Sequence, residues 1–154
     1  MSTEQTWETT STSSENTLKL GVQIGSRLRG GEVIELLSDL GGGKTTFVRG
    51  LARGMGGNDD VHSPSFTISN QYQGKDLTLY HLDFYRLTEP GVMQTELQEM
   101  LSDPQGVVAV EWPDLIEDVL PAKRLQIQIT PASENERSFQ LTFPTELDYL
   151  VPRL

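Results

Sequence analysis

The chain has 154 residues, no cysteine and a formal net charge of -10, from 22 acidic and 12 basic side chains. This length fits one domain, and we predict a single unit over residues 1–154, with residues 1–16 as a frayed end that carries at most one edge strand. The composition excludes disulfides and cysteine-ligated zinc, argues against tight, independent binding of nucleic acid, and leaves no apolar run long enough to cross a membrane.

The first helix is predicted from Thr17 to Arg29. Apolar residues recur there every four positions, as on one face of a helix, at Leu20, Ile24 and Leu28. Arg27 and Arg29 would fall in the last turn, and Gly30-Gly31 would stop the helix. Residues 18–24 also alternate as in a strand, but the basic last turn and the glycines favour the helix.

A strand, a glycine-rich loop and a second helix are predicted next. Residues 32–37 form a short, mostly apolar run between glycines, as expected of a buried strand. After the loop, apolar residues recur at helical spacing until Gly56-Gly57, at Phe47, Val48, Leu51 and Met55. The loop therefore lies between the carboxyl end of a strand and the start of a helix.

The rest of the chain is predicted to extend the sheet around that unit. Gly74-Lys75-Asp76 joins two alternating runs, residues 66–73 and 77–83, which indicates a hairpin. A short helix is predicted over residues 96–101 and a helical turn over residues 114–120. Three further strands are predicted at residues 107–112, 125–130 and 138–143. Together these elements predict an α/β, three-layer fold with a mixed, mainly parallel sheet flanked by helices.

The glycine-rich loop has the spacing of a phosphate-binding P-loop, G-x-x-x-x-G-K-[ST], with Ser38 in place of the first glycine. Backbone N–H groups of such a loop converge on phosphate oxygens at a helix N-terminus. Lys44 would neutralise the β- and γ-phosphates, and Thr45 would give its hydroxyl to Mg²⁺. The alternative is a glycine-rich turn with a solvated lysine, which the flanking strand and helix disfavour. We predict a P-loop NTPase-like fold that binds ATP and Mg²⁺ through Asp39, Leu40, Gly41, Gly42, Gly43, Lys44, Thr45 and Thr46.

Two acidic residues at strand ends complete the predicted site. Asp83 closes the strand predicted at residues 77–83, and Glu111 closes the apolar run that begins at Val107. Each carboxylate would emerge near the loop if these strands flank the first one, although either alone could be an ordinary strand-end acid. The predicted catalytic residues are Lys44, Asp83 and Glu111. His81 is interpreted as a hydrogen-bonded structural residue, outside the site.

Four sequence blocks occur along the chain in a fixed order. They are Asp39–Gly50 (DLGGGKTTFVRG), Ser63–Thr67 (SPSFT), His81–Leu87 (HLDFYRL) and Glu111–Pro113 (EWP). In this order they resemble the TsaE family, the ATPase component of bacterial tRNA threonylcarbamoyladenosine synthesis. The combination is far more specific than the phosphate loop alone. It implies a cytoplasmic, weak Mg-dependent ATPase that acts with two partners, the threonylcarbamoyl transferase subunit and its paralogue. Contact with tRNA would be indirect, through that complex, and no membrane is implied.

The resemblance also implies roles for individual residues. By analogy with the family, Thr45 and Glu111 bind Mg²⁺, and Asp83 is important for activity. The Ser63–Thr67 segment resembles a switch-like loop that partners could read. An arginine near the late hairpin is associated with nucleotide in the family, and Arg137 is the nearest candidate.

Two activities are alternatives to partner-dependent hydrolysis. A non-hydrolysing module would bind ATP only to order its docking loop, and it would show no turnover even with partners. A small-molecule kinase is disfavoured because neither an acceptor-site signature nor an arginine-rich lid is present. GTP is disfavoured because the base-recognition sequence Asn-Lys-x-Asp is absent.

Overall fold

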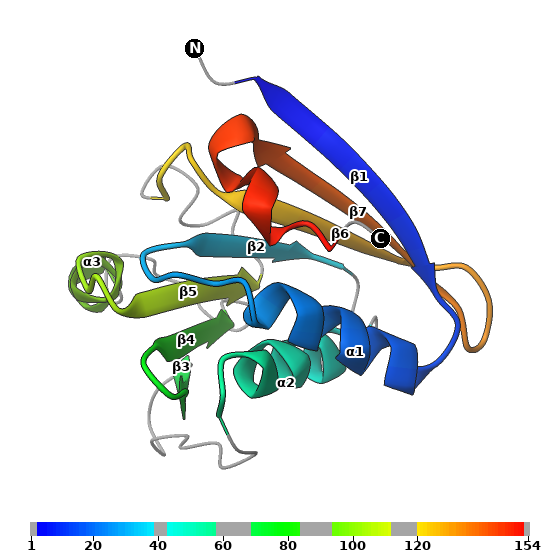
Figure 1. The fold of residues 1–154 in the computed structure, drawn as a ribbon, viewed down its shortest axis with the longest axis horizontal. Helices are drawn as coiled ribbons and strands as arrows, with labels where there is room; N and C mark the ends of the chain where they lie inside the picture. The colour runs from blue at the N-terminus through cyan, green and yellow to red at the C-terminus, as the bar shows by residue number, and fades with distance from the viewer. Residues whose placement is uncertain (1–2, 39–42, 58–68, 84–93, 112–119, 153–154) are drawn as a thin grey trace.

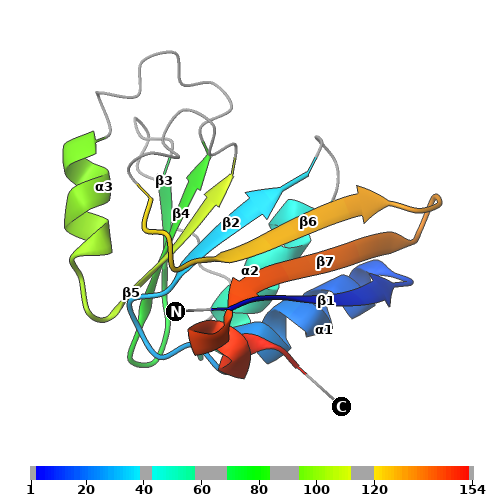
Figure 2. The ribbon, with the colours of Figure 1, turned by 90° about the horizontal axis from the view of Figure 1, so that it is seen from above.

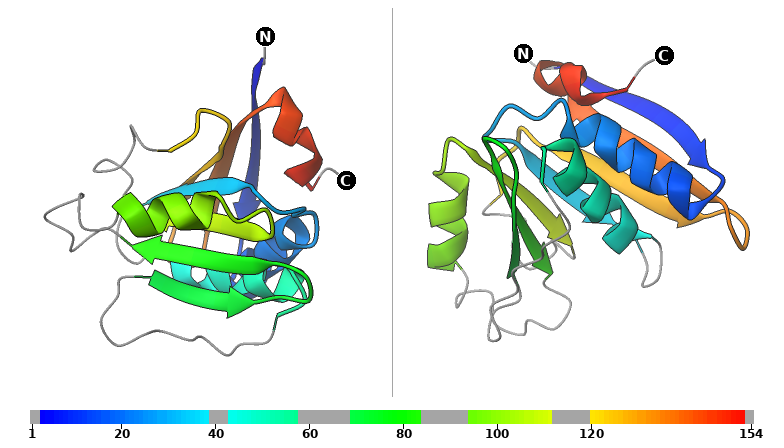
Figure 3. Two further views of the ribbon diagram at one scale, coloured as in Figure 1. Left: turned by 90° about the vertical axis from the view of Figure 1, so that its left-hand side faces the viewer. Right: turned by 60° about the horizontal axis from the view of Figure 1, so that its bottom comes forward.

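A seven-stranded mixed sheet runs through the molecule and carries helices on both faces (Figures 1 and 3). The computed structural model describes residues 3–38, 43–57, 69–83, 94–111 and 120–152. In chain order the elements are β1 (Glu4–Ser11), α1 (Ser14–Gly25), β2 (Val33–Leu37), α2 (Lys44–Gly54), β3 (Ser69–Gln73), β4 (Thr78–Asp83), α3 (Gln94–Leu101), β5 (Gly106–Glu111), β6 (Leu125–Pro131), β7 (Arg137–Pro144) and the 3-10 helix η3 (Thr145–Leu150).

The strand order is β1-β7-β6-β2-β5-β4-β3. The central strands β6, β2, β5 and β4 are parallel, and antiparallel strands extend the sheet at both edges (Figure 2). Helices α1 and α2 lie side by side on one face, and α3 covers the other (Figure 3). The predicted α/β fold with a mixed, mainly parallel sheet is therefore confirmed, as are the hairpin of β3 and β4 and the edge strand β1. The prediction of a frayed end is wrong for residues 4–16, because β1 pairs with β7 along its whole length and α1 begins at Ser14.

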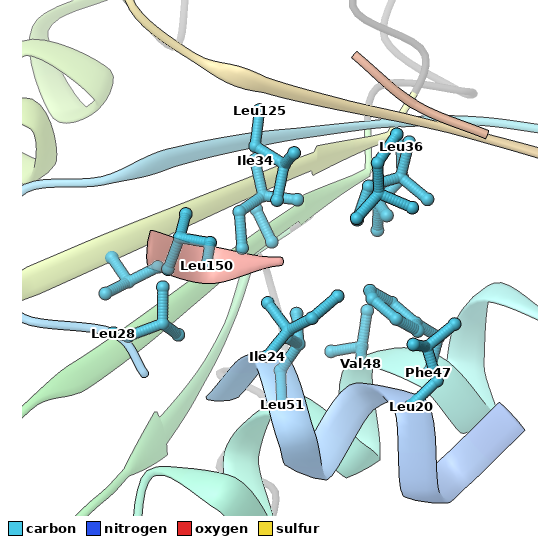
Figure 4. Packing of buried hydrophobic residues seen from close by; sticks show 14 of the residues in the cluster. Leu20, Ile24, Leu28, Ile34, Leu36, Phe47, Val48, Leu51, Leu125 and Leu150 are labelled. Atoms are coloured by element: carbon cyan, nitrogen blue, oxygen red, sulfur yellow. The ribbon is translucent and has the colours of Figure 1, made fainter. Parts of the chain in front are cut away.

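The central strands are apolar on both faces because helices cover both. Ile34 and Leu36 of β2 face the two-helix side, where they meet Ile24 of α1 and Leu51 of α2 (Figure 4). Val33 points the other way, into a second cluster that includes residues of β4, β5 and α3. Burial of each such side chain stabilises the fold by about 1.5–3 kcal/mol, so the position of β2 at the centre of the sheet is strongly fixed.

Glycines fill the contact between α1 and α2. Gly21 and Gly25 of α1 pack against α2, and Gly50 and Gly54 of α2 pack against α1. A Cβ atom added at Gly21 would lie 2.9 Å from the Cα atom of Gly50, and one added at Gly54 would lie 2.3 Å from the carbonyl oxygen of Val22. The spacing of four keeps both glycines of a helix on one face. The two backbones are therefore in direct contact.

Helix α1 ends at Gly25, before the predicted end at Arg29, and the strand alternative is wrong. Beyond the helix the chain tightens, with a hydrogen bond of 3.0 Å from the Arg27 N–H to the carbonyl of Ile24. The backbone N–H groups of Arg29 and Gly30 donate instead to the carboxylate of Glu32, at 2.7 Å each. A buried carboxylate thus captures the donors that a longer helix would have used.

The same carboxylate anchors η3, an element that the sequence patterns did not predict. The Tyr149 hydroxyl donates to Glu32 Oε2 at 2.6 Å, and the Arg29 guanidinium lies 3.8 Å from the centre of the Tyr149 ring. Leu147 and Leu150 of η3 are buried in the two-helix side of the core. The C-terminal segment is therefore fastened by both apolar packing and a hydrogen bond to a charged group.

Replacing Tyr149 with phenylalanine is expected to lower the free energy of unfolding by about 1–2 kcal/mol at pH 8, because Glu32 loses a donor. Burial and the bond to Glu32 raise the pKa of Tyr149. A raised folded-state pKa means that this stability is present below about pH 10, where an unfolded tyrosine ionises, and is lost at higher pH. Urea unfolding of both proteins at pH 8 and pH 11 should therefore show a smaller difference at pH 11. A difference that grows with pH would contradict this assignment.

A buried ion pair lies on the face of the sheet opposite α1 and α2. Glu35 of β2 is 2% exposed and accepts hydrogen bonds from Arg124 Nε at 2.5 Å and from Gln126 Nε2 at 3.2 Å. Its pairing explains how a carboxylate is tolerated in a strand that is covered on both sides. We interpret this network as structural.

Some predictions fall where the structure gives no description. The helical turn expected at residues 114–120 lies outside the described residues except for Leu120, as do residues 66–68 of the expected hairpin. The other predicted strands and the short helix are confirmed, each with its ends shifted by two residues or fewer. Across the described ranges, no helix has the length and apolar character needed to cross a membrane.

Candidate functional site

The carboxyl ends of β2, β4 and β5 meet at one edge of the sheet. Leu36 of β2 pairs with Glu111 of β5, and Asp83 of β4 pairs with the same glutamate from the other side. Ligands of open α/β sheets bind beside the carboxyl ends of the strands. The register therefore brings both predicted acidic positions next to the strand that precedes the glycine-rich loop.

Helix α2 starts at this edge with a glycine in the left-handed region. Gly43 is the residue before the helix and has φ 93° and ψ 10°, a conformation that strains any residue with a side chain. Within the described residues, no side chain caps this helix start. The N–H groups of a first turn are donors without helical partners and carry partial positive charge. This helix start can therefore receive an anion.

Lys44 is the first residue of α2 and is only 6% exposed. Its Nζ atom is 3.3 Å from Glu111 Oε1 and donates to the carbonyl oxygen of Ser38 at 3.2 Å. The ammonium group thus links Ser38, which follows β2, to Glu111, the last residue of β5. Two residues predicted from separate parts of the sequence are in contact.

The second carboxylate oxygen of Glu111, Oε2, contacts a different residue. His81 of β4 lies with Nε2 2.5 Å from Glu111 Oε2, and both side chains are buried. Burial acts to raise the pKa of Glu111, but the hydrogen bond and charge of His81, together with Lys44, outweigh it and hold that pKa below its usual range. Glu111 is therefore an ionised acceptor with its two oxygens in separate contacts.

Arg137 lies on the other side of the helix start. A cavity of about 90 Å³ opens between the start of α1, the start of α2 and the hairpin that joins β6 to β7. The Arg137 guanidinium lines it and donates to the hairpin carbonyls of Ser133 and Glu136, at 3.1 Å and 3.0 Å. The residues that line the cavity are Ser13, Ser14, Thr17, Gly43, Thr46, Glu134, Asn135 and Arg137.

The remaining predicted residues divide into three groups. Thr45 is exposed and Thr46 is half-buried in the first turn of α2. Asp83 is placed by its backbone as the last residue of β4. The loop residues Asp39, Leu40, Gly41 and Gly42 lie outside the described residues.

The sequence interpretation left out His81, which the fold brings to this edge in contact with Glu111. Tyr72 of β3 pairs with Leu79, near the amino end of β4, yet the charge of Glu111 still acts on it. Burial raises the pKa of Tyr72, Arg49 acts in the opposite sense, and the charge of Glu111 adds to the rise. The signal for His81 was its place two residues before Asp83, since alternate residues of a strand share a face.

Comparison with known proteins identifies the family. The family model described as threonylcarbamoyl adenosine biosynthesis protein TsaE matches residues 11–139. The chain belongs to the TsaE family. The match includes the helix start, both strand-end acids and Arg137.

Individual TsaE proteins agree with this assignment. The protein from Bacillus subtilis (strain 168) named tRNA threonylcarbamoyladenosine biosynthesis protein TsaE is 45% identical over 116 residues, which cover 73% of this chain and 70% of that one. The Nostoc protein of the same name is 37% identical over 131 residues, or 83% and 80% of the two chains. The crystal structure of Bacillus subtilis YdiB superposes with a TM-score of 0.74 and 36% identity, over 97% of this chain and 93% of that one.

The donor atoms at this edge of the TsaE fold suit a hard cation. The hydroxyl of Thr45 and the ionised carboxylate of Glu111 are oxygen ligands of the kind that Mg²⁺ takes. In the part of the chain that the structure describes, no three His, Cys, Asp or Glu side chains gather as a metal site. An ion held here would therefore need phosphate oxygens and water as its other ligands, which is how Mg²⁺ enters nucleotide sites.

Proposed function

We propose that this chain is a weak, cytoplasmic Mg-dependent ATPase of tRNA threonylcarbamoyladenosine synthesis, activated by the threonylcarbamoyl transferase subunit and its paralogue. The observation that supports the proposal is the contact of Glu111, at 3.3 Å, with Lys44, the first residue of a helix that no described side chain caps. The names of the TsaE relatives support the pathway. The net charge of -10 agrees with a subunit that leaves tRNA contacts to its partners.

Lys44 is the residue that binding of ATP would move. In the structure its ammonium group lies 3.3 Å from Glu111 Oε1 and forms an ion pair with it. A triphosphate at the helix start offers more negative charge than one carboxylate, so Lys44 would turn to the β- and γ-phosphates. The first-turn N–H groups of α2 would donate to the same phosphates.

Glu111 and Thr45 are the residues that would hold Mg²⁺, and Asp83 is proposed to orient the attacking water. The ion would neutralise charge on the phosphates during in-line attack. Asp83 is assigned this role because its backbone position in β4 is in register with Glu111. Arg137 would contact the nucleotide from the cavity beside Gly43 and Thr46.

Replacing Lys44 with alanine is expected to weaken binding of ATP by about 10- to 100-fold and to remove turnover, because a charged contact with phosphate contributes roughly 1.5–3 kcal/mol. Affinity is measured by calorimetry with a non-hydrolysable ATP analogue. Turnover is measured as phosphate release with and without the two partner proteins. Lys123→Ala, at an exposed lysine far along the sequence, is the matched control and should behave like the wild type.

Each result of this experiment has a defined meaning. Turnover that rises with the partners and disappears in Lys44→Ala supports the ATPase. Binding of ATP without turnover in any mixture favours the non-hydrolysing docking module. Equal affinity of Lys44→Ala and the wild type would contradict the nucleotide site itself.

A further inference from the structure

Among the described residues, His81 is a buried titratable side chain that contacts a proposed site residue and for which the proposed reaction has no task. It is 7% exposed and contacts Glu111 through Nε2. The other ring nitrogen, Nδ1, is buried and has no hydrogen-bond partner among the described residues. An unsatisfied buried polar atom costs about 1–3 kcal/mol. A histidine present only for stability would be expected to use both nitrogens, so its bond to Glu111 calls for another explanation.

The geometry of Glu111 supplies that explanation. Oε1 faces Lys44 and Oε2 faces His81, so each oxygen has its own partner. His81 comes from the neighbouring strand, where it pairs with Ala109 and not with Glu111, so its side chain reaches along the sheet toward the strand end. Bound nucleotide would affect the two contacts differently. The phosphates would draw Lys44 away from Glu111, whereas the hydrogen bond between His81 and Glu111 would remain.

We propose that His81 is a positioning residue, which holds Glu111 by Oε2 so that Oε1 is presented to Mg²⁺ or its water shell once Lys44 has moved to the phosphates. This inference rests on the proposed nucleotide site. Glu111 accepts the Nε2–H proton of His81, because an ionised carboxylate has no proton to donate. Partners of this kind orient metal ligands, and their loss typically lowers metal affinity 10- to 100-fold.

Two amide substitutions separate this role from a structural one. In His81→Gln the side-chain amide reaches about as far as Nε2 and can still donate to Glu111. In His81→Asn the amide corresponds to Nδ1 and falls short of the carboxylate. The pair therefore differs in whether the bond to Glu111 survives.

Metal affinity is measured with Mn²⁺ as the probe, by electron paramagnetic resonance, on the full chain saturated with a non-hydrolysable ATP analogue. Affinity for the analogue in EDTA is measured separately. We expect His81→Asn to bind Mn²⁺ at least about 10-fold more weakly, His81→Gln to recover most of that loss, and both variants to bind the analogue in EDTA within about twofold of the wild type.

Wild-type Mn²⁺ affinity in His81→Asn would overturn the role of His81 while leaving the nucleotide site intact. Equal losses in both variants, in EDTA as well as with Mn²⁺, would also overturn it, because they indicate a structural role. Failure of the wild type to bind the analogue at all would overturn the proposed function, and this inference with it.

A measurement on the wild type keeps the inference testable if neither variant folds. The chain has two histidines, so the Nε2–H signal of His81 is assigned in nuclear magnetic resonance spectra with His62→Gln. A hydrogen-bonded Nε2–H signal that persists when the analogue and Mg²⁺ are added supports the proposal. Its loss on addition would show that His81 releases Glu111, which overturns it.

Discussion

Replacing Glu111 with glutamine is expected to lower ATP turnover by at least about 100-fold, which corresponds to about 3 kcal/mol of lost stabilisation of the transition state by the metal and its ligands. Affinity for ATP in EDTA is expected to stay the same or to increase. The reason is that Lys44 loses the carboxylate that it contacts at 3.3 Å, so binding no longer breaks an internal ion pair.

The two parts of this prediction are measured separately. Phosphate release is followed with the partner proteins present, and ATP affinity is measured by calorimetry in EDTA. Glu99→Gln, at an exposed glutamate of α3, removes the same charge away from the site and should leave both quantities unchanged. A fall in metal-free affinity that matches the fall in turnover would mean that Glu111 supports the fold of the site and does not act through a metal.

Replacing Gly50 with alanine is expected to lower the free energy of unfolding by about 2 kcal/mol or more. The added Cβ atom would lie 2.4 Å from the carbonyl oxygen of Leu18 and 2.9 Å from the Cα atom of Gly21. Both are backbone atoms, so no rotation of a side chain relieves the clash and the helices must separate. The separation outweighs the gain of about 1 kcal/mol that alanine brings to a helix interior.

Urea unfolding followed by circular dichroism measures this loss. Lys19→Ala also places alanine in a packed pair of helices, but at an exposed position, and should change stability by no more than about 0.5 kcal/mol. A variant of Gly50 that is as stable as the wild type would show that α1 and α2 are not in the close contact described above.

Patterns confined to one segment predicted much of this fold. The apolar run predicted β2 and the helical spacing predicted α2. Both predictions were correct because glycines mark the two ends of each segment. The end of α1 was mispredicted because the residue that decides it, Glu32, binds the N–H groups of Arg29 and Gly30 only in the folded chain, together with Tyr149. A contact that forms only in the folded chain therefore sets the end of α1, and the local sequence pattern does not show it.

Part of the candidate site could also be predicted from local sequence patterns, and part depends on the folded chain. Lys44 and Glu111 could be proposed because a glycine-rich loop and a strand end are visible in the sequence. The role of His81 could not, since its contact with Glu111 joins residues 30 positions apart and depends on the parallel register of β4 and β5. The place of His81 two residues before Asp83 indicates a shared strand face, but not the register that sets it against Glu111.

The glycine contact between α1 and α2 also has a mechanical consequence. Backbones in direct contact resist sliding and turning against one another, so we expect the two helices to move together. At the far end of α2, the N–H of Lys75 in the β3–β4 turn donates to the carbonyl of Met55 at 3.0 Å. We therefore expect a displacement that starts at Gly43 to reach this turn, about 18 Å away along the helix axis, without any change in secondary structure.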